Sequence, residues 1–116
     1  RKGHMWGYAW GADYPDAENF LQLFISRNAS PGPNDSTYSD PDFDRMYEEA
    51  LKLPDSPKRT ALYQQMVQKV VEDCPWIFGV HPQEFWLAQP WLKNMKPHEL
   101  DHSKAKYLRV DPEARR

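Results

Sequence analysis

The sequence has little of what disulfide-bonded, metal-binding and membrane-spanning proteins need. Its 116 residues include one cysteine and five glycines, and no apolar run approaches the length of a membrane-spanning helix. A single cysteine cannot form an internal disulfide, and it lacks the spacing of a metal site. Cys74 directly precedes Pro75, where we expect it to fill a small buried space. The chain begins with Arg rather than Met, so the lack of a signal peptide says little about location.

An excess of one charge is also missing. The chain has 15 basic and 17 acidic residues, which gives a net charge of −2. This balance favours neither nucleic acid nor an anionic membrane as a partner. What the chain does have is eleven prolines and 14% aromatic residues. Such a composition indicates many chain reversals and a few large apolar anchors in one small domain or a piece of a larger one.

Patterns typical of catalytic and metal sites are weak. The sequence contains no G-x-S-x-G motif, glycine-rich phosphate loop or C-x-x-C pair. His98 and His102 would share one face of a helix, but a preceding proline and polar neighbours favour an exposed loop. Asp40, Asp42 and Asp44 alternate as calcium ligands do, yet the glycine and distal glutamate of an EF-hand are missing. We therefore expect a non-catalytic module without a cofactor, in which these three acids mark the start of a helix.

The hydrophobic pattern predicts an α+β chain with two main helices, a short helix and three or four short strands, in a single partial domain over residues 1–116. A proline that follows an acid or a serine marks the start of each long helix, and Asp16 is placed to cap the short one. We expect helices near residues 16–26, 41–53 and 57–73 and strands near residues 5–10, 76–81, 84–89 and 106–110.

Each long helix carries an apolar stripe at helical spacing. The short proline-containing link between the two helices predicts that they pack as an antiparallel pair. The predicted strands are too few to cover both helices, so we expect partner strands elsewhere. The stripes consist of Phe43, Met46, Tyr47, Ala50 and Leu51 in the first helix and Leu62, Tyr63, Met66, Val67, Val70 and Val71 in the second.

A segment near the start, residues 6–16, gathers aromatic, glycine and acidic residues before a proline turn. In α/β proteins, ligands are usually held where strands end in such turns. Asp13 has no Lys or Arg near it in sequence, so a buried Asp13 needs a partner from elsewhere, and a cationic ligand group is one candidate. The alternative is that Asp13 is a structural residue of the turn before the Asp16 helix.

Several ordered motifs resemble one protein family. Residues 7–21 resemble W-x-A-D-Y-x-(D/E)-P-x-x-F-L, residues 38–44 resemble Y-(S/N)-N-P-x-F-D, and residues 59–63 resemble R-x-x-L-Y. Residues 72–77 resemble E-D-A-P-x-I, and residues 89–92 fit the strand that follows. In this order the motifs resemble the family 5 extracellular solute-binding proteins, which are the oligopeptide- and dipeptide-binding components of bacterial ABC importers.

The resemblance implies that the chain is a C-terminal fragment of a two-lobed α/β protein with the periplasmic binding protein type II fold, which closes on its ligand by hinge motion. It implies a location in the periplasm or lipid-anchored at the outer face of the cytoplasmic membrane. The implied partners are a peptide or other small solute, an ABC transporter permease and the remainder of the parent chain, with no nucleic acid.

The resemblance also implies site residues. Asp13 would meet the free α-ammonium group of a peptide ligand, and Trp10 and Gly11 would line the cleft. Gly11 stands where several family members carry a larger residue, which would widen the site or let the backbone approach the ligand. The alternatives are a family member that binds an oligosaccharide or other non-peptide solute, and a free-standing interaction module built on the helix pair. An enzyme is the third class, for which the sequence shows no nucleophile–base pair.

Overall fold

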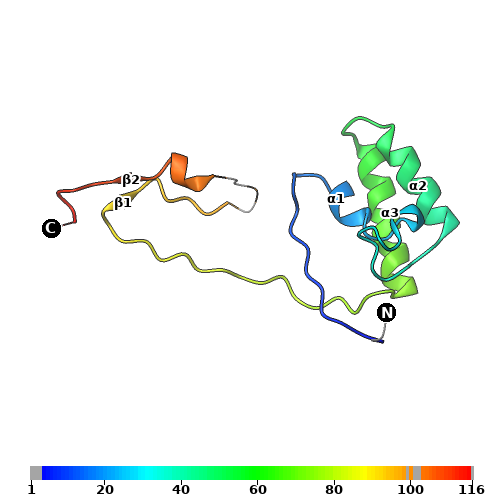
Figure 1. Cartoon of the computed structure of the whole chain (residues 1–116). Coiled ribbons are helices and arrows are strands. Elements are labelled where there is room, and N and C mark those ends of the chain that lie inside the picture. The colour runs from blue at the N-terminus through cyan, green and yellow to red at the C-terminus, as the bar shows by residue number, and fades with distance from the viewer. Residues whose placement is uncertain (1–3, 99, 101–102, 116) are drawn as a thin grey trace. The chain divides into compact units, whose positions relative to one another are not determined.

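The structure is a computed structural model that describes residues 4–98, 100 and 103–115, and the chain divides into two compact units between Gly79 and Val80. The first unit holds three α-helices, and the second holds a two-stranded sheet (Figure 1). This is the α+β content that the sequence predicts. The elements are α1 (Glu18–Leu21), a 3-10 helix (Ser26–Asn28), α2 (Pro41–Leu51), α3 (Pro57–Asp73), β1 (Leu92–Lys93), a second 3-10 helix (Lys104–Lys106) and β2 (Arg109–Val110).

Helices α2 and α3 begin where local capping chemistry places them. The Asp40 carboxylate accepts the Phe43 amide at 2.7 Å before α2, and the Ser56 hydroxyl accepts the Arg59 amide at 3.3 Å before α3. A proline occupies the first turn of each helix, where its missing amide hydrogen costs no hydrogen bond.

Helix α3 ends at Cys74, which has a left-handed backbone (φ 49°) and an exposed side chain. The expectation of a buried Cys74 was wrong, because no element of the described chain covers its side chain. The helix cannot continue here, since the proline that follows disfavours helical backbone in the residue before it. Helix α1 is also shorter than the predicted 16–26. Ile25 is extended (ψ 135°), which lets the Ser26 amide donate to the Asp44 carboxylate of α2 at 3.0 Å.

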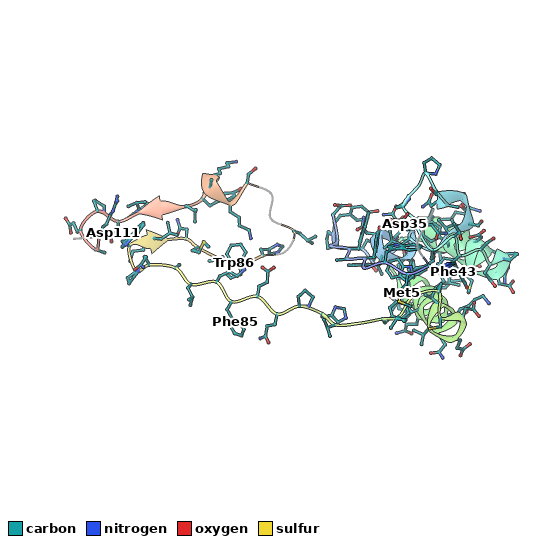
Figure 2. The ribbon with its side chains drawn as sticks, turned by 60° about the horizontal axis from the view of Figure 1, so that its bottom comes forward. Met5, Asp35, Phe43, Phe85, Trp86 and Asp111 are labelled. Carbon is teal, nitrogen blue, oxygen red and sulfur yellow. The ribbon has the colours of Figure 1, made fainter. Side chains whose placement is uncertain are left out.

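The core of the first unit lies between α2, α3 and the segment that includes and follows α1. Figure 2 labels Phe43, which is fully buried among these helices. Each predicted stripe is only partly buried, because Leu51, Val67 and Val71 remain 43–52% exposed. Burying an apolar side chain needs a covering element, and the described chain places none over these three. The buried apolar residues are Leu21, Leu23, Phe24, Ile25, Phe43, Met46, Tyr47, Ala50, Met66 and Val70.

The sheet is smaller than the sequence predicts. In the described residues, Leu92 pairs with Val110 and Lys93 with Arg109 in an antiparallel ladder, so the strand predicted at 106–110 is reduced to β2. The segments predicted as strands at 5–10, 76–81 and 84–89 carry no strand. A strand requires a partner for its backbone hydrogen bonds, and the described chain offers none to these segments.

The unpaired segments expose large apolar side chains. Met5 is 76% exposed, Ile77 79%, Phe85 81% and Leu87 97%, and Figure 2 shows the Phe85 ring projecting from its segment into open space. None of the helices in the described part of the chain has the length and apolar character needed to span a bilayer.

Candidate functional site

The candidate site is a cluster of three residues, Trp10, Asp13 and Asn19, which we call the Asn19 cluster. The Asn19 Oδ1 atom accepts two hydrogen bonds, from the Trp10 indole Nε1 at 2.9 Å and from the Asp13 backbone amide at 3.1 Å. The Asn19 Nδ2 atom donates to Asp13 Oδ2 at 3.4 Å. Two of the three predicted site residues therefore meet on the side chain of a residue that the sequence analysis did not single out.

Trp10 is held from its other side by aromatic neighbours. Its ring is half-buried against the core and stacks on Tyr8, with ring centroids 6.3 Å apart and planes at 11°. Tyr8 meets the edge of Trp76 at 5.1 Å, and Trp76 packs on Phe24 of the core at 4.6 Å. These contacts attach the segment before Asp13 to the helical unit, although that segment forms no strand.

Gly11, the third predicted site residue, lies in open space. A Cβ atom added at Gly11 would have no heavy atom of another segment within 4 Å, and the backbone of Gly11 does not have a positive φ. Within the described chain, neither a close approach nor backbone strain therefore requires glycine here. The position next to Trp10 is empty enough to accept a larger side chain or another group.

The Asp13 carboxylate is exposed, and no cationic side chain in residues 4–98, 100 and 103–115 forms an ion pair with it. Its Oδ2 atom faces Asn19, and its Oδ1 atom has no hydrogen-bond partner in the same residues. The bonds to Asn19 fit the structural turn role. The unoccupied Oδ1 atom is what the ligand role would use, so the geometry is compatible with both.

Asp16 anchors the turn that follows. Its Oδ1 atom accepts the Glu18 amide at 2.9 Å and the Tyr63 hydroxyl at 3.2 Å, and its Oδ2 atom accepts Arg59 Nη1 at 2.6 Å. Burial acts to raise the pKa of Asp16, but the Glu18 amide and the Arg59 guanidinium outweigh it and hold this pKa below its ordinary value. The predicted cap is therefore displaced by one residue: Ala17 is the N-cap of α1, and the side chain of Asp16 bonds to α3 as well.

Glu18 adds a second anchor to α1. Its carboxylate accepts hydrogen bonds from the Tyr14 hydroxyl and from the Tyr47 hydroxyl of α2. Burial and the bond to Glu18 raise the pKa of Tyr47, so this phenol stays protonated and serves as a donor. The turn that carries Asp13 is thus fixed to both long helices.

The remaining candidate groups are accounted for by structure. Asp40 caps α2 and pairs with Lys69 at 2.9 Å, and Asp42 pairs with Arg45 at 3.1 Å. With Asp44 bound to Ser26, these three acids serve the start of the helix, as the sequence predicts. In the described residues, no group of three or more His, Cys, Asp and Glu side chains is arranged to hold a metal ion.

The second unit has a hollow of about 410 Å³ whose lining includes Lys96, His98, Lys104 and Tyr107. His98 Nδ1 accepts the Leu100 amide at 3.1 Å. His102, which sequence analysis placed with His98 in an exposed loop, lies outside the described residues.

The curated proteins that resemble this chain are all named as binding proteins. No protein-family model matches the chain, and neither does a solved structure. The periplasmic oligopeptide-binding protein OppA of Escherichia coli (strain K12) is 31% identical over 83 residues, which are 72% of this chain and 15% of that protein. Di/tripeptide-binding protein 4 of Pseudomonas aeruginosa (strain UCBPP-PA14) is 32% identical over 77 residues, 66% of this chain and 14% of that protein.

A further relative, heme-binding protein A of Haemophilus influenzae, is 28% identical over 86 residues, 74% of this chain and 16% of that protein. The chain thus spans 14–16% of the length of these curated relatives. The matches agree with the ordered motifs in the sequence. On both grounds, the chain belongs to the family 5 extracellular solute-binding proteins.

Proposed function

We propose that the protein that contains this chain captures a peptide, or a related small solute, in the periplasm and delivers it to the permease of an ABC importer. Family membership supports the solute-binding role, and two of the relatives are named for oligopeptides and for di- and tripeptides. We place the protein in the periplasm or on a lipid anchor at the outer face of the cytoplasmic membrane.

In this proposal, the chain is one part of a periplasmic binding protein type II fold. The exposed apolar segments at 5–10, 76–81 and 84–89 would pair there with strands of the remainder of the parent chain. That pairing would satisfy their backbone groups and cover side chains such as Ile77 and Leu87, which are 79% and 97% exposed in the chain alone.

The observation that carries the proposal is the state of the Asp13 carboxylate. Asn19 holds one of its oxygens, the other has no partner in the described residues, and no cationic side chain there neutralises it. A peptide α-ammonium group supplies both the missing charge and the missing donors. Trp10 and the open position at Gly11 flank the carboxylate and would form the wall of the cleft.

The first alternative is a non-peptide solute, because one relative is named for haem. A helix-pair interaction module remains the alternative of another class, and the exposed Val67 and Val71 of α3 are the observation behind it. Binding measurements distinguish a solute-binding protein from an interaction module, because the module would show no saturable binding of small solutes.

The proposal is tested by a double-mutant cycle on the full-length protein. Asp13→Asn removes the charge and keeps the side-chain size, while N-acetylation removes the positive charge of the α-ammonium group of the ligand trialanine. Losing one partner of a desolvated charge pair costs about 3–5 kcal/mol, which is on the order of 100-fold or more in affinity. We expect Asp13→Asn to weaken trialanine binding by that factor and to leave N-acetyl-trialanine nearly unaffected.

General damage to the fold cancels in this cycle, because it weakens both ligands equally. Equal weakening of trialanine and N-acetyl-trialanine would assign Asp13 to the turn and would exclude it from ammonium binding.

A further inference from the structure

The hydrogen bonds of the Asn19 cluster fix the orientation of the Asn19 amide. The indole Nε1–H of Trp10 and the backbone N–H of Asp13 are both donors, and neither can accept. The side-chain atom that meets both of them must therefore be the oxygen of Asn19. It follows that the NH₂ group is the part of Asn19 that faces Asp13 Oδ2.

Asn19 is buried, and its backbone is held by the turn before α1. Its side chain is only 1% exposed, although it is polar, and leaving such a group without partners would cost about 1–3 kcal/mol. Its backbone amide donates to the Asp16 carbonyl at 3.1 Å, and Asp16 is itself bound by Arg59 of α3. The amide that meets Trp10 and Asp13 is thus held in place by the helical unit.

We infer that Asn19 is a positioning residue of the ligand site: it aims the Asp13 carboxylate and holds the Trp10 ring beside it. This inference rests on the proposed function, because it assigns to Asn19 the geometry that ammonium binding by Asp13 requires. By occupying Asp13 Oδ2, the Asn19 NH₂ group leaves Oδ1 for the ligand. By accepting from the indole, Asn19 Oδ1 sets the ring at one wall of the same site.

The first test compares two substitutions on one short segment of the full-length protein. Asn19→Ala removes all three bonds of the cluster. Gln22→Ala is the matched control, because Gln22 Nε2 donates to the Asn19 backbone carbonyl, at 3.1 Å, and the Gln22 side chain makes no hydrogen bond to Asp13 or Trp10 in the described residues. We expect Asn19→Ala to weaken trialanine about tenfold more than N-acetyl-trialanine, as loss of a bond to a charged group predicts. We expect Gln22→Ala to leave this preference unchanged.

The second measurement follows ligand binding in the wild-type protein. Selective ¹⁵N-asparagine labelling follows the side-chain amide of Asn19 in the wild-type protein, and Asn19→Asp, which keeps the side-chain size, assigns its signal by removing it. We expect this signal to move when trialanine binds and to stay in place with N-acetyl-trialanine, because only the former brings a charge to the carboxylate that the amide contacts.

The outcomes separate this inference from the proposal on which it rests. If Asp13→Asn abolishes the preference for the free amine but Asn19→Ala keeps it, Asp13 binds the ammonium and the role of Asn19 is refuted. The role of Asn19 is also refuted if Gln22→Ala loses the preference for trialanine to the same extent. It is refuted as well if the Asn19 amide signal moves with neither ligand. If Asp13→Asn itself keeps the preference, the ligand role of Asp13 fails and the positioning role of Asn19 fails with it.

Discussion

The Asp16–Arg59 contact provides the sharpest test of how the candidate site is held in place. Asp16 Oδ2 lies 2.6 Å from Arg59 Nη1, and the two side chains are only 26% and 16% exposed. The Arg59 Nε atom also donates to the Ala50 carbonyl of α2, at 3.2 Å. One guanidinium therefore joins the turn before α1 to both long helices.

Asp16→Asn keeps the side-chain size but removes the charge that Arg59, Tyr63 and the Glu18 amide share. A hydrogen bond to a charged group contributes about 1.5–3 kcal/mol, so we expect the local opening free energy of residues 14–25 to fall by about 2 kcal/mol. Native-state hydrogen exchange on the full-length protein measures this directly, and about 2 kcal/mol corresponds to roughly 30-fold faster exchange there.

Asp42→Asn is the matched control for this substitution. Asp42 also pairs with an arginine, at 3.1 Å, but the side chains of Asp42 and Arg45 are 71% and 67% exposed. Exposed pairs contribute about 0–1 kcal/mol, so exchange at residues 14–25 should hardly change in this variant. Equal acceleration by Asp16→Asn and Asp42→Asn, or none by either, would refute the anchoring role of Asp16.

The same contact predicts a pH dependence. The pKa of Asp16 is lowered in the folded state, so its contribution is fully present above the unfolded value, near pH 4, and is lost as the pH falls through the folded value. After correction for the intrinsic exchange rate, protection at residues 14–25 should therefore fall below about pH 4 in the wild type. Asp16→Asn should lack this contribution to the acid dependence.

Two further predictions concern packing and autonomy. Met66 of α3 is fully buried and Val67 is half exposed. In urea titrations of the full-length protein, Met66→Ala should therefore lower the unfolding free energy by about 2–5 kcal/mol, and Val67→Ala should lower it far less. Similar losses in the two variants would contradict the assigned core. Residues 1–116 expressed alone should be marginally stable or self-associating, because their apolar segments lack strand partners. A monomer with a cooperative thermal transition above about 60 °C would contradict this, since that is stable for an ordinary domain.

The long helices could be predicted from the sequence because their determinants are local. Asp40 and Ser56 cap the backbone amides three residues further on, and the apolar spacing selects the buried face. The exposed Leu51, Val67 and Val71 show the limit of this reasoning. Periodicity identifies the apolar face of a helix, but it does not tell whether the same chain supplies the surface that covers it.

The strands and the candidate site depended on contacts that the sequence pattern does not specify. The segments at 76–81 and 84–89 have strand-like composition, yet a strand forms only with a partner. The structure brings Trp10 and Asp13 together on the Asn19 side chain, while their role in ligand binding stays a prediction. The role of Asn19 was missed, because a single asparagine among polar and apolar neighbours gives no sign that it will be buried against an indole. Its position six residues after Asp13, within the same family motif, was the one available signal.

The measurement that tests the central claim most directly is calorimetric titration of the full-length wild-type protein, freed of bound ligand, with trialanine, N-acetyl-trialanine and haemin. Peptide capture through an ammonium site predicts saturable, one-to-one binding of trialanine and binding of N-acetyl-trialanine that is on the order of 100-fold weaker or more, as expected for an unpaired buried charge. Binding of haemin alone would contradict the peptide assignment. Saturable binding of none of the three would contradict peptide capture and favour the interaction module.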